Sequence, residues 1–393
     1  MRERLSVLNA AAALVTVLVV VLADGVSRSA PVDPRPAGSV TFNGPVHTAA
    51  YWGDTIYVGG DFTTATWGGH NVARLHTAAV NARTGALLPW SPQVDATVRT
   101  IDADSDGVYL AGNFHLVNGA GRDNLAKVDH AGVLQPTLKH RIDGHPDSMS
   151  VGGGRLYLGG SITAVDGQAR TGVAAFDLVT GELDPQWHPY LNDVVNVVRY
   201  TAGRVYLGGR FDSVDGARGT KKIAALDPVT GAVDPGFWSH VSAMVNDIAI
   251  VDGSIYVGID GGGGRVSSMD LTGQVRWTVA TDGAVQAVTV LDGVLYLGGH
   301  FDNVCGSANT GHLGVCLDGA TRRVKLAAVD PGSGALLGWI ADGNGSVGVR
   351  ALRSSKELGQ LVAAGAYTAV NGSPQRRFAL FNLVSPTASD ITW

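Results

Sequence analysis

The chain has no run of basic residues, and its acidic residues outnumber its basic ones. It has 29 Lys and Arg against 34 Asp and Glu, for a net charge of −5 at pH 7. Proteins that bind nucleic acid present a positive surface to the phosphates, so we expect no nucleic-acid partner. Beyond the N-terminal region no segment is apolar enough to cross a membrane, so we expect no membrane span in the mature chain. We also expect the protein to be a monomer.

Motifs that mark common catalytic centres are also missing. The sequence has no HExxH, no Gly-x-Ser-x-Gly and no P-loop; the glycine run at 261–264 lacks the Lys and Ser or Thr that a P-loop needs. We interpret that run as a shortened loop. The absence of these motifs does not exclude an enzyme, because an active site assembled from single residues of several repeats has no local sequence motif.

The N-terminal residues have the pattern of an export signal. Arg2 and Arg4 precede a charge-free apolar run, Ala10 to Ala23, which ends in a cleavage-site pattern. We therefore predict a signal peptide over residues 1–23 and a secreted, extracellular protein. The alternative is an uncleaved signal that anchors the chain to the membrane. Residues 24–38 contain several Pro and Gly and are predicted to be a disordered linker.

Cysteine is scarce, and the two that occur lie close together in the sequence. Cys305 and Cys316 are 11 residues apart. In an exported protein this pair predicts a disulfide, which would stabilise the loop by about 2–3 kcal/mol. A metal site is poorly supported, because His300 and His312 are nearby but no CxxC-type spacing accompanies them.

Glycine, in contrast, is abundant, with 54 residues, and 45% of the chain is hydrophobic. Glycine costs about 1 kcal/mol in a helix interior but is favoured in tight turns. The composition therefore predicts an all-β fold with many turns and a large core.

A short strand of the form aliphatic-Tyr-aliphatic-Gly-Gly recurs along the chain. Its tyrosines are 52, 48, 49, 50 and 40 residues apart, and a worn copy, 361–365, is the seventh. The six tyrosines are Tyr57, Tyr109, Tyr157, Tyr206, Tyr256 and Tyr296. Each copy has the pattern of four short strands, which cannot bury their faces alone and must stack on neighbouring copies. We predict a seven-bladed β-propeller of four-stranded blades over residues 39–393.

The fourth strand of most copies ends near a tryptophan, at Trp90, Trp187, Trp238, Trp277 and Trp339. We expect these rings to wedge between adjacent blades. Residues 40–42 have the pattern of a further fourth strand. They are expected to pair beside 378–381, so that an N-terminal strand closes the ring and removes exposed sheet edges.

These patterns resemble those of secreted bacterial propellers of the delta-sixty repeat type, within the kelch and quinoprotein-like superfamily. The resemblance rests on Gly-Gly-x-Phe-x-x-Val-Asp-Gly, Ala-Ala-Leu-Asp-x-x-Thr-Gly and Asp-Pro-x-Trp, and it covers residues 46–384. It implies a propeller that serves as a secreted or surface binding module. Segments 175–181 and 225–231 also look like the tryptophan-docking motif of quinoproteins. The spacing to Trp187 differs, so no quinone cofactor is inferred.

Repetition separates structural residues from candidate functional ones. Residue types that recur from copy to copy, such as the marker tyrosines and the Asp before the Thr-Gly or Ser-Gly turns, are interpreted as structural. The residue after Gly-Gly varies instead, on the face where the long loops meet the mouth of the central channel. With nearby polar loop residues it gives the candidate ligand-binding set Asp61, Asn113, His115, Ser161, Arg210, Asp212, His300 and His312. Neutral sequence variation at solvent-facing positions would produce the same pattern, and it remains the alternative to a binding face.

One segment matches the opening of a calcium loop. Asp102, Asp104 and Asp106 precede Gly107 in the pattern Asp-x-Asp-x-Asp-Gly, but Asn113 stands where an EF-hand has Glu. A hairpin turn explains Asp106-Gly107 without a metal. No cofactor is predicted, and calcium is left open.

Two functions are compatible with these patterns. The favoured one is a secreted, non-enzymatic propeller that binds a carbohydrate or protein ligand, such as a glycan, a peptide or a cell-wall polymer, through its long-loop face. The alternative is an extracellular enzyme, a hydrolase, lyase or quinone-dependent dehydrogenase, with its site at the channel mouth.

Overall fold

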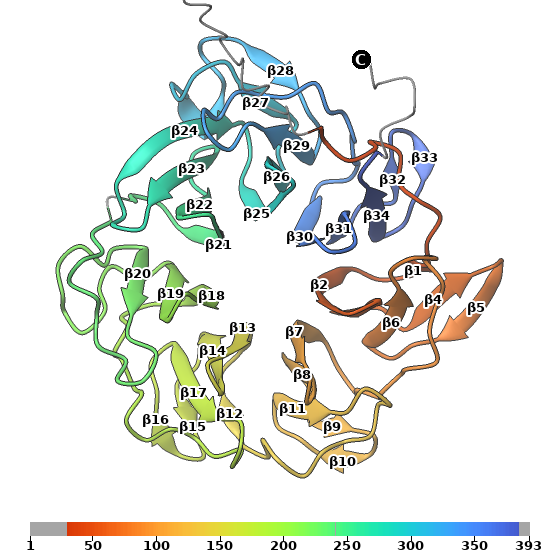
Figure 1. Ribbon diagram of the computed structural model, residues 1–393, viewed down its shortest axis with the longest axis vertical. Helices are drawn as coiled ribbons and strands as arrows, with labels where there is room; N and C mark the ends of the chain where they lie inside the picture. The colour runs from red at the N-terminus through yellow and green to blue at the C-terminus, as the bar shows by residue number, and fades with distance from the viewer. Residues whose placement is uncertain (1–29, 240, 385–393) are drawn as a thin grey trace, which may run out of the picture.

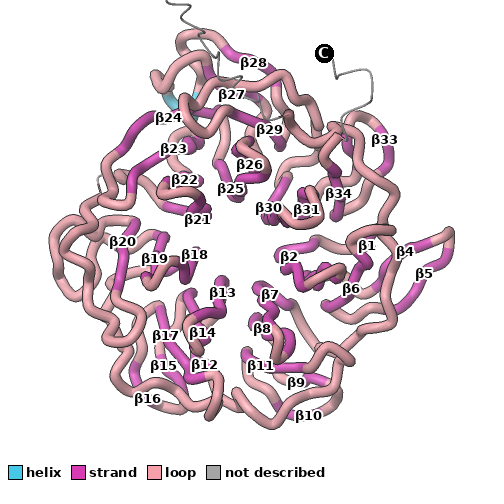
Figure 2. The backbone as a smooth tube through the Cα atoms, viewed as in Figure 1, coloured by secondary structure: helices cyan, strands magenta, loops and turns pink. Residues whose placement is uncertain are grey.

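The computed structural model describes residues 30–239 and 241–384. These residues form strands and turns, and their helical content is a single 3₁₀ turn, His312–Gly314 (Figure 2). Among them no helix is long and apolar enough to span a bilayer. The predicted signal peptide, residues 1–23, lies outside the described residues, as does the start of the predicted linker.

In the described residues, each repeat of the sequence contributes three antiparallel strands, and these sets of strands are arranged around a common axis (Figure 1). In repeat 5 the three strands belong to a six-stranded sheet, and in the other repeats they form three-stranded sheets. The innermost strands are β2 (Val46–Trp52), β7 (Val98–Asp104), β13 (Pro146–Gly152), β18 (Val195–Thr201), β21 (Val245–Val251), β25 (Val285–Leu291) and β30 (Val349–Ser355). The middle strands contain the repeated marker: β3 (Thr55–Gly60), β8 (Gly107–Gly112), β14 (Arg155–Gly160), β19 (Arg204–Gly209), β22 (Ser254–Ile259), β26 (Val294–Gly299) and β31 (Gln360–Gly365). The third strands are β6 (Thr77–Asn81), β11 (Leu125–Val128), β17 (Val173–Asp177), β20 (Ile223–Leu226), β23 (Gly264–Asp270), β29 (Leu326–Val329) and β34 (Phe378–Asn382). Below, the repeats are numbered 1 to 7 in this order.

The predicted fourth strand is long only in repeat 5, where it is β24 (Val275–Thr281). In repeats 1–4 and 6 it is reduced to a single bridge to the third strand, such as Val80 to Leu87 and Phe176 to Leu183. In repeats 1–4 a proline follows two residues after the bridge. Proline has no N–H to continue the ladder, which explains the short pairing.

The long loops after the middle strands fold into small outer hairpins. They are β4 (Thr64–Trp67) with β5 (His70–Ala73), β9 (Leu116–Val117) with β10 (Ala120–Gly121), β15 (Ala164–Val165) with β16 (Gln168–Ala169), β27 (Asn303–Cys305) with β28 (Ala320–Arg322), and β32 (Ala369–Val370) with β33 (Ser373–Pro374). Several of them pair with a segment of the preceding repeat: β15 with β12 (Ile142–Asp143), and β27 with β24. The hairpins thus tie neighbouring repeats together at the rim.

The predicted disulfide between Cys305 and Cys316 is present, with Cα atoms 5.1 Å apart. It closes the longest of these loops, between β27 and β28. A disulfide is consistent with an extracellular protein.

The described part of the predicted linker is ordered, which corrects the expectation of disorder for residues 30–38. Val32 is 1% exposed, and its amide donates to the Tyr296 hydroxyl at 2.8 Å. The Asp33 and Ala37 amides donate to the carbonyl oxygens of Asn382 and Leu380, each at 2.8 Å. The segment is held because its amides extend the open edge of β34.

The strand partner predicted for residues 40–42 also differs. Strand β1 (Thr41–Phe42) pairs with β4 of repeat 1, and it is Ala37 that bridges to Leu380 of β34. The Phe42 ring packs between Phe62 and Phe378, at centroid distances of 4.4 and 6.1 Å. Burial of this ring fixes β1 between repeats 1 and 7, beside rather than within the last sheet.

The Gly-Gly pair of the marker strand is required by close packing on both sides. A Cβ atom on Gly59 would lie 2.5 Å from Cγ1 of Val98, on the innermost strand of the next repeat. A Cβ on Gly60 would collide with the carbonyl oxygen of Pro45. Any side chain at these two positions would therefore separate adjacent strands, which explains the recurrence of the pair.

Most of the recurring aromatic residues hold adjacent repeats together, as expected. The indole Nε1 of Trp90 donates to Asp129 O at 3.2 Å, and that of Trp277 to Pro331 O at 3.0 Å. In both cases the acceptor lies in the following repeat. The Tyr157 hydroxyl likewise donates to Pro228 O in the next repeat, at 2.9 Å.

Trp238 is an exception that corrects the sequence assignment. It is 45% exposed, whereas Phe237 is 3% exposed and packs edge-on against Tyr206, with centroids 5.9 Å apart. The reason is spacing: Phe237 follows Asp234 by three residues, as Trp187 follows Asp184. Repeat 2 has no tryptophan, and there His140 Nε2 lies 2.7 Å from Gly181 O of the next repeat.

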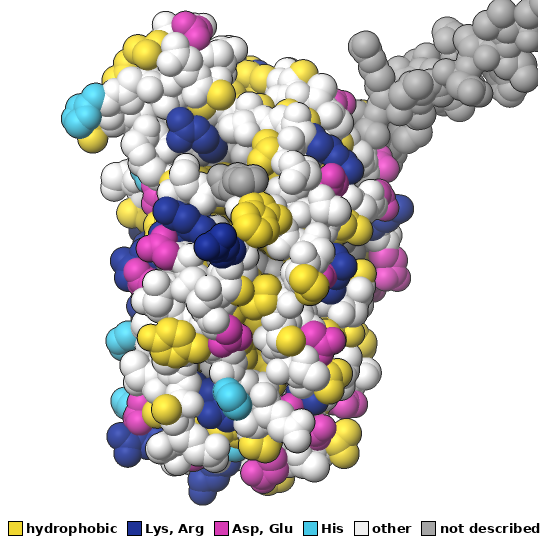
Figure 3. All heavy atoms as spheres, turned by 90° about the vertical axis from the view of Figure 1, so that its left-hand side faces the viewer, with side chains coloured by type: hydrophobic (Ala, Val, Ile, Leu, Met, Phe, Trp, Pro, Cys, Tyr) yellow, Lys and Arg dark blue, Asp and Glu magenta, His cyan; other side chains and the backbone are white. Residues whose placement is uncertain are grey.

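The outer wall of the ring carries charges of both signs. Figure 3 shows one side of this wall, where Lys and Arg, Asp and Glu, and scattered hydrophobic side chains are interspersed. The polar groups that converge on a cavity lie instead on the inner strands.

Candidate functional site

Each innermost strand has a register shift between its first and third residues, so the second residue sits in a bulge. A bulge redirects a side chain away from the regular alternation of the strand. The bulged residue is polar in all seven repeats but differs in type. The set is His47, Arg99, Asp147, Asn196, Asn246, Gln286 and Arg350.

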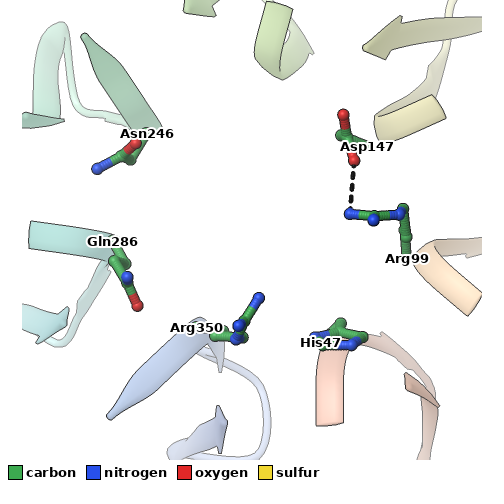
Figure 4. Close-up of a pocket in the computed structure, with 6 residues that line it drawn as sticks. All are labelled: His47, Arg99, Asp147, Asn246, Gln286 and Arg350. Atoms are coloured by element: carbon green, nitrogen blue, oxygen red, sulfur yellow. Dashed lines mark hydrogen bonds and ion pairs between the residues drawn. The ribbon is translucent and has the colours of Figure 1, made fainter. Parts of the chain in front are cut away.

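Six of these side chains line a cavity of about 220 Å³ at the mouth of the central channel, which we call the channel mouth. They are His47, Arg99, Asp147, Asn246, Gln286 and Arg350, and Figure 4 shows them around a common space. Asn196 lines the channel below. The site is thus built from six sheets, each contributing one residue from an equivalent position.

Hydrogen bonds hold one side of the channel mouth. Arg99 NH1 lies 2.9 Å from Asp147 Oδ1, and Arg99 Nε donates to Asn113 Oδ1 at 3.2 Å. His47 Nε2 lies 2.7 Å from Asp61 Oδ2. These contacts fix the orientations of the Arg99, Asp147 and His47 side chains.

The opposite side keeps free hydrogen-bonding capacity. Within the described residues, the Arg350 guanidinium makes no hydrogen bond or ion pair, and Gln286 Oε1 is buried without a partner. Asn246 Nδ2 donates to Val285 O at 3.1 Å, which leaves its amide oxygen available. A ligand would therefore find a cation and two side-chain amides on this side.

The walls of the channel desolvate the groups that they surround. Burial lowers the pKa of His47 against the opposing effect of Asp61, and burial raises the pKa of Asp147 against the opposing effect of Arg99. Arg350 reaches solvent in the channel mouth, but desolvation lowers the pKa of its guanidinium; nearby Asp61 partly offsets this effect. An arginine remains charged after such a shift, so Arg350 is a cation without a direct partner.

A second polar layer lies deeper in the channel. Arg199 NH2 lies 2.5 Å from Asp247 Oδ1, and Arg353 NH1 lies 3.8 Å from Asp247 Oδ2. The same Oδ2 accepts the Val288 amide at 3.1 Å. Since both arginines face one buried carboxylate, this layer braces four neighbouring innermost strands.

The three aspartates of the calcium pattern do not converge. Asp102 points into the channel and accepts the Val151 amide at 2.8 Å, and burial raises its pKa. Asp104 accepts from the Tyr109 hydroxyl and from the Asp106 amide, at 3.1 and 2.8 Å. In the part of the chain that the structure describes, no group of three or more His, Cys, Asp or Glu could hold a metal ion.

The structure places two of the predicted ligand residues at the rim of the channel mouth. These are Asp61 and Asn113, which contact His47 and Arg99. Arg210 pairs with Asp193 at 3.2 Å, and the Ser161 amide donates to His145 O at 2.9 Å. The His300 ring accepts from the Ala284 amide at 3.4 Å. None of the three lines the cavity.

The remaining predicted residues lie in the outer loops. His115 is 3.0 Å from Asp123, and Asp212 is 3.0 Å from Lys222. His312 is in the disulfide-closed loop. These residues do not come together into one site.

The cavity-lining residues were missed by sequence reasoning, although a signal was present. In six of the seven repeats the bulged residue follows a valine, and in repeat 3 it follows Pro146. The residues after these positions run His, Arg, Asp, Asn, Asn, Gln and Arg. A position where a varying polar residue follows a nearly constant one is a candidate functional position. Applied to the first strand of each repeat, this criterion selects the residues that line the cavity.

No protein-family model and no curated protein matches the sequence. Solved structures match the fold. The WD40 β-propeller domain of Doa1 is similar with a TM-score of 0.58 and 12% identity, over 90% of this chain and 98% of that one. The computationally designed Ika8 protein is similar with a TM-score of 0.47 and 13% identity, over 87% and 98%. The likeness to the WD40 domain shows that this chain has a β-propeller fold.

Proposed function

We propose that this chain is a secreted, seven-bladed propeller, closed by its N-terminal segment, that binds a ligand at the channel mouth. Propellers commonly serve as binding or scaffolding modules. The resemblance of the repeats to secreted propellers of the delta-sixty type supports the same view. The ligand is a glycan, a peptide or a cell-wall polymer.

One observation supports this proposal above the others. Seven equivalent bulged positions on a constant framework hold seven polar side chains of five types, and six of them face one cavity. A purely structural position would repeat its residue, as the marker tyrosines and glycines do. Drift at a solvent-facing position would not produce the buried, unpaired oxygen of Gln286.

The size of the cavity limits what enters it. Pockets for drug-sized ligands are usually about 300–1,000 Å³. The cavity of about 220 Å³ is smaller, and it is open to solvent on the long-loop face. It suits a single sugar or amino-acid unit, or the end of a longer chain whose remaining units extend over the loops.

Binding arrays and a plugging variant test the proposal. The mature protein is applied to glycan and peptide arrays, and each ligand found is measured again with Asn246→Trp. Asn246 lines the cavity, and an indole at this position would occupy part of it, so binding should be lost. The matched control is Val179→Trp, at a turn residue that is 88% exposed and does not line the cavity. Binding that persists in the plugged variant would overturn the proposal.

A further inference from the structure

Arg350 is the side chain at the channel mouth whose charge is least compensated. The other arginine there, Arg99, is held by Asp147 at 2.9 Å and by Asn113 at 3.2 Å. Arg350 has neither kind of contact within the described residues, although it lines the same cavity. A guanidinium offers paired donors that match a carboxylate in two parallel hydrogen bonds.

The neighbour of Arg350 on the ring supplies the complementary group. Gln286, on β25, lies beside Arg350, on β30, and both side chains face the cavity (Figure 4). The Oε1 atom of Gln286 is buried without a donor. The Nε2 group of Gln286 is not enclosed in this way and makes no hydrogen bond within the described residues, so it can donate to a hydroxyl oxygen of a ligand.

The residues that line the cavity disfavour two other classes of ligand, neutral sugars and ligands with several negative charges. Among the described residues that line the cavity, the His47 imidazole is the one aromatic ring, so they offer little surface on which a neutral sugar could stack. Asp147 and Asp61 lie at the same mouth, and they would repel a ligand with more than one negative charge. The arrangement therefore favours a single negative charge accompanied by hydroxyl groups.

We infer that the channel mouth binds a hydroxylated monocarboxylate, and specifically a uronic acid unit whose carboxylate pairs with Arg350 and whose hydroxyls reach Gln286 and Asn246. This inference rests on the proposed function and adds the ligand class. A uronic acid is one ring in size, which matches the cavity.

Calorimetry with matched sugars tests the inference. The mature protein is titrated with D-galacturonate, D-glucuronate and oligogalacturonate, each beside a neutral counterpart, galactose, glucose or a galactose oligomer. Glucose 6-phosphate serves as the dianionic probe. At least one uronate should bind more tightly than about 1 mM, and its neutral counterpart at least tenfold more weakly. Added salt should weaken uronate binding.

Two arginine variants locate the charge. Arg350→Gln should lower uronate affinity at least tenfold, since it removes the carboxylate partner. The control is Arg83→Gln, which removes an exposed arginine that pairs with Asp54 at 2.7 Å and should leave the affinity unchanged. Urea denaturation shows that each variant is folded.

The outcomes separate this inference from the proposed function. Uronate binding that Arg350→Gln leaves intact, or tighter binding of glucose 6-phosphate, would overturn the inference. So would an absence of binding to every uronate tested. If a neutral glycan or a peptide binds the wild type and this binding is lost in Asn246→Trp, the uronate inference is wrong. The same result supports the channel mouth as the binding site.

Discussion

The indole Nε1 of Trp187 donates a hydrogen bond of 3.2 Å to the carbonyl oxygen of Asp227, a residue of the following repeat. Trp187 is 0% exposed, and its ring packs edge-on against Tyr157, with centroids 5.3 Å apart. One side chain thus joins the core of repeat 3 to a turn of repeat 4. Trp90 and Trp277 make equivalent contacts with the following repeat.

Truncation of this side chain should destabilise the protein strongly. We expect Trp187→Ala to lower the free energy of unfolding by about 3–5 kcal/mol, because it leaves a cavity between two repeats. Trp187→Phe should cost less, since it keeps most of the ring but loses the hydrogen bond. Urea denaturation gives both values. Trp67→Ala, at an exposed residue of β4, is the control; an equal loss there would contradict the interpretation.

The deeper channel layer provides a second stability test. Asp247 is 5% exposed and faces both Arg199 and Arg353. We expect Asp247→Asn to cost about 3–5 kcal/mol in urea denaturation, because two arginines then lose their buried counter-charge. Asp54→Asn breaks only the exposed pair with Arg83 and should change stability little. A neutral effect at Asp247 would show that water already screens this layer.

The aspartates before the Gly turns should make stability depend on pH in the acid range. Hydrogen bonds from Thr180 and Thr230 lower the pKa of Asp177 and Asp227, and those from Thr272 and Ser333 lower the pKa of Asp270 and Asp330. Because the folded-state pKa lies below the unfolded value of about 3.9, this stabilisation is present above that pH and is lost as the pH falls further.

The variant in which all four turn aspartates are replaced by Asn tests this origin. Its urea midpoint should be lower than that of the wild type at neutral pH and should fall less between pH 4 and pH 2, over the range that begins at about 3.9. Midpoints of the two proteins measured across the acid range decide the matter. Parallel curves would show that other carboxylates dominate acid unfolding.

The disulfide gives a test of both loop stability and export. Mass spectrometry of protein recovered from the culture medium should show Cys305 linked to Cys316 and an N-terminus at or near residue 24. Cys305→Ser with Cys316→Ser should loosen the loop by about 2–3 kcal/mol in the chain-entropy model. Faster proteolysis within residues 306–315 is the measurement. Free thiols in secreted protein would contradict the pairing.

The fold was predictable because its determinants are local and repeated. Tyr57, Gly59 and Gly60 belong to one short strand, and their recurrence indicates both the repeat and its packing against the next copy. The exceptions arise where spacing overrides residue type. Phe237 takes the wedge position because it keeps the distance from Asp234, although Trp238 is the larger residue.

The site was only partly predictable, because it is assembled by the ring and not by any one segment. Variation after Gly-Gly singles out Asp61 and Asn113, which contact two of the lining residues. Gln286 and Arg350 are 64 residues apart and line one cavity only because their two sheets stand side by side. The bulge that turns them toward the axis is a backbone feature of the folded strands. The sequence signal of this bulge is the valine that precedes both residues.

The position of a bound ligand tests the central claim most directly. A crystal structure of the protein with the tightest ligand from the arrays should show that ligand at the mouth of the channel, within hydrogen-bonding distance of Gln286 and Arg350. A ligand bound on the outer hairpins or on the opposite face, with the channel mouth unchanged, would contradict the account.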